Sequence, residues 1–409
     1  MRYTKYLRFV CLLSSVLALS ACEKLQIKPT PPEVPVCACQ AQTLEPVKPA
    51  EVKPEVRVPD FSLLKPADWQ ELDAITKDDV TKAWPAWQLG CSALKAKPLW
   101  QSVCNEADKL NNPSKTAIVD YFKKNFAVYR TTNLDGSNTG LITGYYEPAI
   151  NGSRTKTDKY RFPLYSRPDD LITVELASLF PELANKRVRG RVVGTKLIPY
   201  YNRSEIEAEN SPLQGREFVW VDDQIDLFFL QIQGSGMVHL DNGEKMHVGY
   251  ADQNGQSYQS IGRLLIDKGE LTADKASMQG IKDWARNNPG KLRELLNANP
   301  SYVFFRELPA GLPGPLGALG VPILAERAVA IDPRFVPLGA PIFLSTNLPN
   351  SNKPLNRLMM AQDTGGAIKG GVRADFFWGA GADAGKSAGS MKQQGKIWVL
   401  LPKDFPLPK

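Results

Sequence analysis

The chain has 409 residues, of which 43% are hydrophobic, and this is enough for one large or two ordinary globular domains. Its formal net charge of +7 falls to +4 if Arg2, Lys5 and Arg8 leave with an N-terminal leader, a balance too mild to indicate a nucleic-acid partner. The only two histidines, His239 and His247, leave little material for a Ser-His-Asp or Cys-His catalytic system.

Residues 1–21 are predicted to be a lipoprotein signal peptide. Basic residues precede an apolar run over residues 9–19, which is too short to span a bilayer. The run ends in Leu-Ser-Ala-Cys, which resembles the lipobox of bacterial lipoproteins, so we expect Cys22 to be acylated. Because Glu23 follows rather than an aspartate, we expect a lipid-anchored protein on the periplasmic face of the outer membrane. An ordinary cleavage site beside a chance cysteine is the alternative.

Residues 22–59 are predicted to form a tether, because they are rich in Pro, Val, Lys and Glu and almost lack aromatic residues. In a polyproline-like conformation, at about 3.1 Å per residue, the tether reaches on the order of 100 Å. It would hold a folded domain away from a membrane surface.

The remaining cysteines predict a disulfide rather than a metal site. Cys37 and Cys39 lie in the tether, without a second pair at the spacing of zinc ligands. Cys91 and Cys104 stand alone in the globular part, and in an oxidising periplasm we expect them to pair. We predict no metal ion and no organic cofactor.

Residues 60–130 are predicted to be helical. Apolar residues recur on one face, although Pro85 indicates a break or a helix start. Asn112 and Pro113 predict the cap and first turn of a further helix. The residues on the predicted buried faces are Val80, Trp84, Trp87, Cys91 and Leu94, then Ile118, Phe122 and Phe126.

Beyond residue 141 the pattern becomes one of strands and turns, so the fold class is predicted to be mainly β with a few helices. Asp241, Asn242 and Gly243 separate two alternating runs and predict a hairpin. Ser277 is the expected cap of a helical stretch that ends near residue 300. Strands are predicted within residues 141–150, 216–223, 225–236, 237–250, 325–345, 355–366 and 395–402.

The aspartates near the C-terminus are the candidate catalytic residues. Asp363 stands in an Asp-Thr-Gly tripeptide of the kind that aspartic proteases use, but such proteases need two copies and this chain has one. Asp375, twelve residues on, precedes Phe-Phe-Trp, and apolar surroundings favour a protonated carboxyl group that can donate. Asp332 begins the same β region. Taken singly, each of the three is more typical of a turn residue.

Several longer motifs resemble a known family. They are GYYEP (144–148), QIQGSG (231–236), SYQSIGRLLIDKGE (257–270), SMQGI (277–281), PSYVFFRE (300–307) and QDTGGAIKGGVRADFFWGAG (362–381). In this order they resemble the membrane-bound lytic murein transglycosylases of the A type, whose C-terminal three-aspartate domain is matched by Asp332, Asp363 and Asp375.

The resemblance implies a fold and its domains. A double-psi β-barrel would be built from residues 60–148, which include N-terminal helices, and from the three-aspartate part over residues 310–409. A second, smaller β-barrel-like domain would be inserted over residues 149–309. Glycan strands would lie in the groove between them.

The resemblance also implies a reaction on peptidoglycan. Asp375 would be both general acid and general base, cleaving the bond between N-acetylmuramic acid and N-acetylglucosamine to leave a 1,6-anhydro end. Asp363 and Asp332 would support it by holding the loop or raising the pKa of Asp375. The expected substrate contacts are Tyr145, Tyr146, Gln231, Gln233, Ser235, Lys369 and Trp378, with core packing as the alternative for the aromatic residues.

Three other functions compete with this one. A glycan hydrolase would use Asp363 as a base acting on water. A peptidoglycan-binding lipoprotein would keep the groove without catalysis, and an aspartic protease is the most distant alternative. The expected partners are glycan strands, the membrane through the lipid on Cys22, and cell-wall synthesis or septal proteins.

Overall fold

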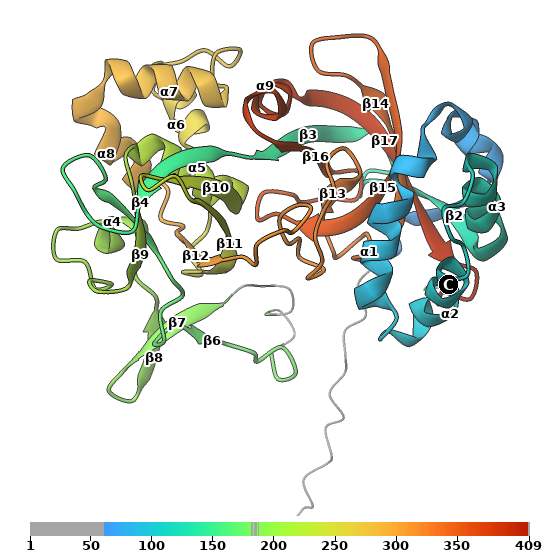
Figure 1. Ribbon diagram of the computed structural model, residues 1–409, viewed down its shortest axis with the longest axis horizontal. Coiled ribbons are helices and arrows are strands. Elements are labelled where there is room, and N and C mark those ends of the chain that lie inside the picture. Colours follow the sequence, from blue (N-terminus) through green and yellow to red (C-terminus); the bar gives the residue numbers. More distant parts are fainter. Residues whose placement is uncertain (1–60, 181–182, 184–185, 187, 408–409) are drawn as a thin grey trace, which may run out of the picture. The chain divides into compact units, whose positions relative to one another are not determined.

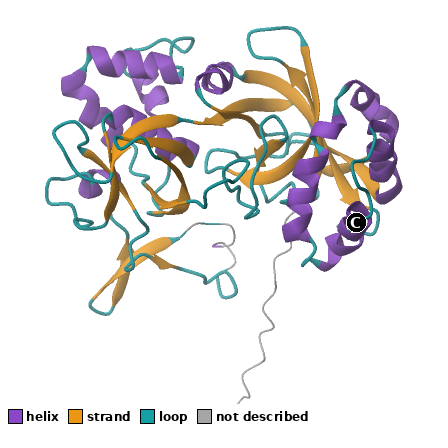
Figure 2. Ribbon diagram, in the orientation of Figure 1, coloured by secondary structure: helices purple, strands orange, loops and turns teal. Residues whose placement is uncertain are grey.

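The structure, a computed structural model, describes residues 61–180, 183, 186 and 188–407 (Figure 1). The predicted signal peptide, the tether and the candidate lipidation site Cys22 lie outside these residues. Strands outnumber helices, as predicted (Figure 2). No helix in the described part of the chain has the length and apolar character needed to cross a bilayer.

Six strands form a closed barrel, in the order β17-β14-β15-β13-β16-β3, with β3 pairing back onto β17. Two neighbouring pairs, β13 with β15 and β16 with β3, are parallel. Two further strands, β1 (Leu64–Ala67) and β2 (Phe126–Thr131), extend the sheet from β17. The barrel strands are β3 (Gly140–Glu147), β13 (Ala328–Ile331), β14 (Pro341–Asn347), β15 (Pro354–Thr364), β16 (Ala374–Ala380) and β17 (Lys392–Pro402).

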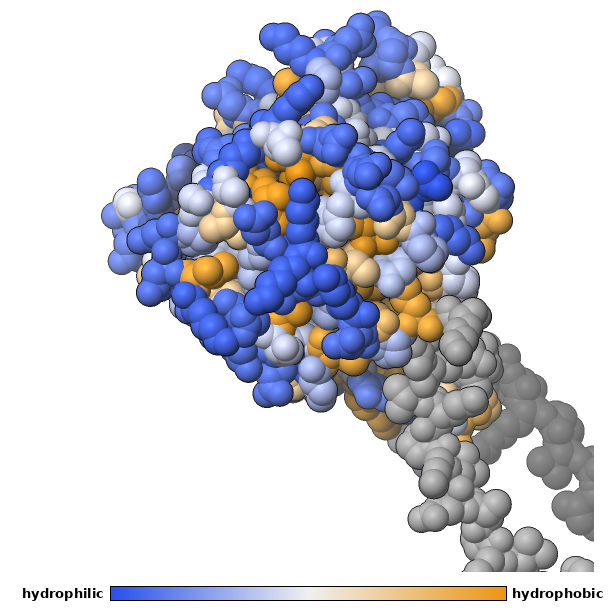
Figure 3. Space-filling model, turned by 90° about the vertical axis from the view of Figure 1, so that its right-hand side faces the viewer, coloured by the Kyte–Doolittle hydropathy of each residue, from blue (hydrophilic) through white to orange (hydrophobic). Residues whose placement is uncertain are grey.

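The larger hydrophobic core joins the barrel to the N-terminal helices. Val329, Ile331 and Phe376 are fully buried in it, as is Trp87 of the first helix. The helical segments are the 3-10 helices η1 (Trp69–Lys77) and η2 (Val80–Lys82) and the α-helices α1 (Trp84–Leu94), α2 (Pro98–Asp108) and α3 (Lys115–Asn125). The face of the molecule on the side of these helices is mainly hydrophilic, with scattered hydrophobic patches (Figure 3). This is expected for helices that direct one apolar stripe inward.

The structure corrects the predicted helix boundaries. Pro85 lies in the first turn of α1, where its missing N–H costs no hydrogen bond, so it marks a helix start. The next predicted cap is wrong, because Ser114 caps α3 by accepting from the Ala117 amide, whereas Asn112 has a positive φ. Phe126, expected on that helix, is the first residue of β2.

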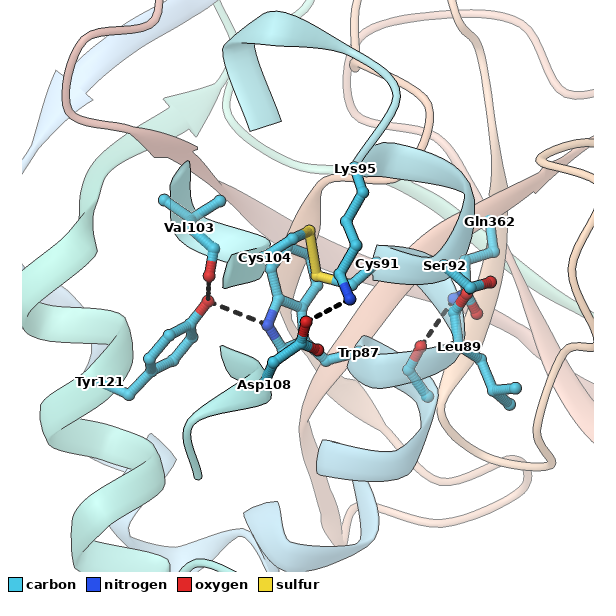
Figure 4. The surroundings of a disulfide bond; sticks show 11 residues. Trp87, Leu89, Cys91, Ser92, Lys95, Val103, Cys104, Asp108, Tyr121 and Gln362 are labelled. Carbon is cyan, nitrogen blue, oxygen red and sulfur yellow. Dashed lines mark hydrogen bonds and ion pairs between the residues drawn. A yellow bond between two sulfur atoms is a disulfide. The ribbon is translucent and has the colours of Figure 1, made fainter. Parts of the chain in front are cut away.

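Cys91 of α1 and Cys104 of α2 form a disulfide, the pairing that the sequence analysis favoured (Figure 4). Their Cα atoms are 5.3 Å apart. Beside the bond, the Trp87 indole donates to the Tyr121 hydroxyl over 3.1 Å, and that hydroxyl donates to the Val103 carbonyl over 2.7 Å. The disulfide therefore ties together two helices that also share a buried hydrogen-bonded core.

A second six-stranded sheet, in the order β12-β11-β10-β4-β9-β5, is built from the chain between β3 and β13. Its strands are β4 (Ala149–Ser153), β5 (Phe162–Tyr165), β9 (Glu217–Val221), β10 (Ser235–Leu240), β11 (Lys245–Gln253) and β12 (Val303–Glu307). A three-stranded sheet of β6 (Ile172–Thr173), β7 (Arg189–Val193) and β8 (Lys196–Pro199) belongs to the same stretch. The helices are α4 (Arg203–Ile206), α5 (Gln224–Gln233), α6 (Ile261–Asp267), α7 (Met278–Asn287), α8 (Pro289–Asn297) and, after β16, α9 (Ala382–Ser390).

The predicted strand over residues 225–236 is mostly a helix, α5. Asp223 caps its start by accepting from the Ile225 and Asp226 amides, and Gly234 ends it in the left-handed conformation with φ 81°. An apolar run that is buried on most sides has no clear period, and here the caps decide between helix and strand. The predicted hairpin of β10 and β11 and the Ser277 cap of α7 are confirmed.

A buried ion pair fastens η1 and η2 to the barrel. The Arg327 guanidinium, 4% exposed, donates to both carboxylate oxygens of the fully buried Asp78, over 2.7 and 3.0 Å. Asp78 also accepts from the Leu358 amide over 2.8 Å. The charge of each partner is thus compensated inside the core.

Candidate active site

Asp363 and Asp375 lie in one row across four neighbouring barrel strands. Ala330 of β13 separates them, paired with Asp363 of β15 on one side and with Asp375 of β16 on the other. Thr143 of β3 continues the row beyond Asp375. Because adjacent strands are about 4.8 Å apart, the Cα atoms of the two aspartates are roughly 10 Å apart, with only a methyl side chain between them.

A β-bulge brings Asp363 to the same face of the sheet as Asp375. Between the pairs Ala328–Met360 and Ala330–Asp363, β15 contains one residue more than β13. Side chains alternate across a strand, so the extra residue moves Asp363 away from the face on which Met360 enters the core. Sequence spacing alone does not reveal such a bulge.

Asp375 is only partly exposed, and its environment suits a proton donor. Burial raises the pKa of Asp375 from its ordinary value of 3.8 to about 6, and the nearby charge of Asp363 acts in the same direction. Two groups oppose this: the Thr143 hydroxyl, which donates to Asp375 Oδ1 over 2.5 Å, and the charge of Arg373. Near neutral pH both the protonated and the ionised form of Asp375 are therefore accessible.

The oxygens of Asp363 are occupied by three donors. The Tyr145 hydroxyl donates to Oδ2 over 2.9 Å, and the amides of Ala318 and Thr364 donate to Oδ1 over 3.0 and 2.8 Å. Burial, followed by the charge of Asp363, raises the pKa of Tyr145 well above its ordinary value. Tyr145 thus remains a donor, and Asp363 is fixed in position.

Asp332 is held by an arginine rather than facing Asp375. It is fully buried, and Arg334 Nη2 lies 2.6 Å from Oδ2, with Nε 3.0 Å from Oδ1. The Gly370 amide donates to Oδ2 over 2.9 Å. Although burial raises its pKa, Arg334 and the backbone amides outweigh burial and lower the pKa of Asp332 below its ordinary value. Asp332 thereby anchors the loop between Asp363 and Asp375.

A cavity of about 670 Å³ extends from Asp363 and Tyr145 to the second sheet. Four of the predicted contacts lie in its wall: Tyr145, Gln231, Gln233 and Ser235. Asp375 itself is a neighbour of these lining residues and not one of them. The cavity is lined by both polar and apolar residues, and its volume lies in the usual range of ligand-binding pockets.

For two of the predicted contacts, the aromatic residues Tyr146 and Trp378, the structure shows packing against methionine side chains, and their contact with substrate stays a prediction. The Tyr146 hydroxyl is directed to Met278 Sδ, 3.5 Å away, and the Trp378 indole donates to Met391 Sδ over 3.3 Å. Alternation along β16 explains the second case, because Asp375 and Phe377 share one face while Trp378 shares the other with the core. Among the described residues, neither Tyr146 nor Trp378 lines this cavity or the smaller one beside it.

The smaller cavity, about 340 Å³, holds Lys369, the last of the predicted contacts. It shares Arg189 and Thr364 with the main cavity, so the two cavities are adjacent. In the described part of the chain no cluster of three or more His, Cys, Asp or Glu residues is arranged to hold a metal ion.

Comparison with known proteins identifies the family. Residues 141–306 match the MltA specific insert domain and residues 327–401 match the 3D domain. A crystal structure of MltA from Neisseria gonorrhoeae is 39% identical, with a TM-score of 0.73 over 84% of this chain and 93% of that one. The chain belongs to the membrane-bound lytic murein transglycosylase A family.

Two further relatives of the family extend the comparison. Membrane-bound lytic murein transglycosylase A of Escherichia coli K12 is 33% identical over 267 residues, which is 63% of this chain and 65% of that protein, slightly less than two thirds of its length. A crystal structure of Escherichia coli MltA with bound chitohexaose shares the fold, with 24% identity and a TM-score of 0.61 over 84% of this chain and 92% of that one.

Two residues that affect Asp375, one through a hydrogen bond and one through its charge, were not found from the sequence. Thr143 reaches Asp375 because β3 and β16 pair in parallel, although 232 residues separate them in the chain. Arg373 Nη2 donates to the Thr143 hydroxyl over 2.9 Å, and burial lowers the pKa of Arg373. The Arg-x-Asp spacing was a visible signal for Arg373, but nothing local indicated Thr143.

Proposed function

We propose that the chain is a peptidoglycan lytic transglycosylase that cleaves between N-acetylmuramic acid and N-acetylglucosamine and leaves 1,6-anhydromuramic ends. The observation that carries the proposal is Asp375, a partly exposed carboxyl group with its pKa raised to about 6, beside a groove of sugar-binding size. The names of the relatives and the chitohexaose bound to the Escherichia coli protein support a glycan substrate.

In the first step, protonated Asp375 donates to the glycosidic oxygen. The bond from this oxygen to C1 of the muramic sugar breaks, and positive charge develops on that sugar as on an oxocarbenium ion. The surroundings that disfavour the ionised carboxylate before the reaction also keep its proton available near pH 6. The glycan strand that ends in N-acetylglucosamine then departs.

In the second step, ionised Asp375 takes the proton of the C6 hydroxyl of the same muramic sugar, whose oxygen attacks C1 to close the anhydro ring. Because the attacking hydroxyl belongs to the same sugar, its effective concentration at C1 is high, and the reaction does not need a bound water as the nucleophile. A single acid and base therefore suffices. The carboxyl group ends protonated, ready for the next cleavage.

The other groups are given supporting roles. Asp363, held by the Tyr145 hydroxyl and two amides, supplies negative charge near the developing cation and helps to raise the pKa of Asp375. Asp332 fixes the loop between Asp363 and Asp375 through Arg334 and the Gly370 amide. Its pairing with Arg334 favours the loop-holding role over a direct effect on Asp375.

A hydrolase would need one carboxylate free to activate water. The three hydrogen bonds to Asp363 occupy both of its oxygens and argue against that role.

In the same proposal the six-stranded barrel has the double-psi connection, with residues 149–309 inserted into it. The protein is a lipoprotein acylated on Cys22 and acts on the periplasmic face of the outer membrane.

The experiment that tests this function measures how fast purified sacculi release soluble fragments. It compares the wild-type chain and its variants, all without residues 1–22. Asp375→Asn should slow release by at least about 100-fold, because loss of a general acid and base typically costs 10² to 10⁴ in rate. Asp383→Asn, an exposed aspartate at the start of α9, is the matched control and should release fragments at the wild-type rate. Equal rates for wild type and Asp375→Asn would refute the assignment.

A further inference from the structure

Among the described residues, the lining of the smaller cavity has more basic than acidic side chains. Two basic side chains from the β6–β7 region, Lys186 and Arg189, face two from the barrel loops, Arg334 and Lys369. The acidic lining residues are Glu175 and Asp332, and Asp332 is fully buried behind Arg334. Substrate entering this cavity therefore meets more cationic than anionic groups.

Two of the four cations are held in place by buried carboxylates. Arg189 Nε lies 3.0 Å from Oδ1 of Asp252, whose side chain is 8% exposed. Arg334 uses Nε and Nη2 on Asp332, which leaves Nη1 of a 43% exposed side chain for another partner. Their positions are thus set before any ligand binds, which lowers the entropic cost of recognition.

The cavity adjoins the reacting groups. Thr364, which follows Asp363 directly, lines both cavities, and Ile331 pairs with Thr364 one position beyond the Ala330–Asp363 pair. A muramic sugar beside Asp375 would carry its C3 lactyl substituent away from the glycan axis. The side cavity offers room for such a branch, whereas an unbranched glycan has no group that needs it.

We propose that the side cavity binds the stem peptide of the muramic residue through the peptide's carboxylates. This inference rests on the proposed function for its substrate, but it names a separate site and a separate ligand chemistry, an acidic peptide. Carboxylates are matched by the planar guanidinium of Arg334 and by the ammonium groups of Lys369 and Lys186.

The first test uses activity on two substrates. Wild type and Lys186→Gln/Lys369→Gln are compared on sacculi and on the same glycan strands stripped of peptides by an amidase. The double variant should raise KM for the peptide-bearing substrate by about 3- to 10-fold, since exposed ion pairs are each worth up to about 1 kcal/mol. Its KM should rise less on stripped strands than on sacculi. Lys353→Gln/Lys403→Gln, at exposed barrel positions, is the control.

The second test does not depend on cleavage. Binding of the stem peptide released by the amidase is measured by calorimetry, against the same peptide with its carboxyl groups esterified. The free acid should bind wild type, more weakly at high salt, and the esterified peptide and the double variant should show little binding. If the peptide binds but neither substrate is cleaved, the side site stands and the proposed function fails. An equal rise in KM on both substrates, or equal binding of both peptides, would overturn the side site.

Discussion

The Thr143 hydroxyl is predicted to hold down the pKa of the catalytic carboxyl group. It donates to Asp375 Oδ1 over 2.5 Å and so stabilises the ionised form. A hydrogen bond to a charged group contributes about 1.5–3 kcal/mol, and each pKa unit corresponds to 1.36 kcal/mol. Thr143→Val, which keeps the shape and removes the hydroxyl, should therefore raise the pKa of Asp375 from about 6 by about 1 to 2.

The assay is kcat/KM on sacculi as a function of pH. Because Asp375 must be protonated to donate, activity falls as pH rises through its pKa, and this basic limb should move to higher pH in Thr143→Val. Thr143→Ser retains the hydroxyl and should keep the limb near the wild-type position. A basic limb that stays in place, or moves to lower pH, in Thr143→Val would refute the reasoning.

Three further predictions concern stability. The pKa of Asp375 is higher in the fold than its ordinary 3.8, so its stabilising contribution is complete below about pH 3.8 and is lost as pH rises through about 6. Asp375→Asn should therefore raise the free energy of unfolding near neutral pH, by at most about 3 kcal/mol. At about pH 3.5 the same substitution should not raise it. Urea unfolding at both pH values checks this, and a wild-type advantage near neutral pH would contradict it. Cys91→Ala/Cys104→Ala should lower the free energy of unfolding by about 3 kcal/mol in urea unfolding, and reducing conditions should do the same to wild type. No change in either case would show that the disulfide does not contribute to stability. Asp78→Asn should cost about 3–5 kcal/mol by leaving the buried Arg327 uncompensated, and a loss below about 1 kcal/mol in the same assay would indicate that water reaches that charge.

Much of the fold could be predicted from local sequence signals. The β10–β11 hairpin was visible in Asp241-Asn242-Gly243, and the start of α7 in Ser277. Such features depend on residues within a few positions of each other. Helix α5 was missed because its run of apolar residues has no clear period, and the decisive caps stand outside that run.

The acidic residues of the site could be predicted from the sequence, whereas the contacts that shift their pKa values could not. Asp375 and Asp363 stood out by their motif, but the hydrogen bond of Thr143 to Asp375 depends on a parallel strand pair between segments 232 residues apart. The contact of Trp378 with Met391 was not foreseen, because a motif does not reveal which face of a strand is buried. Register and bulges, which are tertiary properties, decided these cases.

The central claim, that Asp375 alone serves as acid and base in an intramolecular ring closure, is tested most directly by the chemistry of the products. Muropeptides released from sacculi by wild type are reduced with borohydride and analysed by mass spectrometry. Anhydro ends, which are lighter than reducing ends by one water and resist reduction, should appear with wild type and Asp383→Asn and be absent with Asp375→Asn. Products with reducible ends would contradict the account, because they would mean that water attacks the muramic sugar and that a second group must activate it.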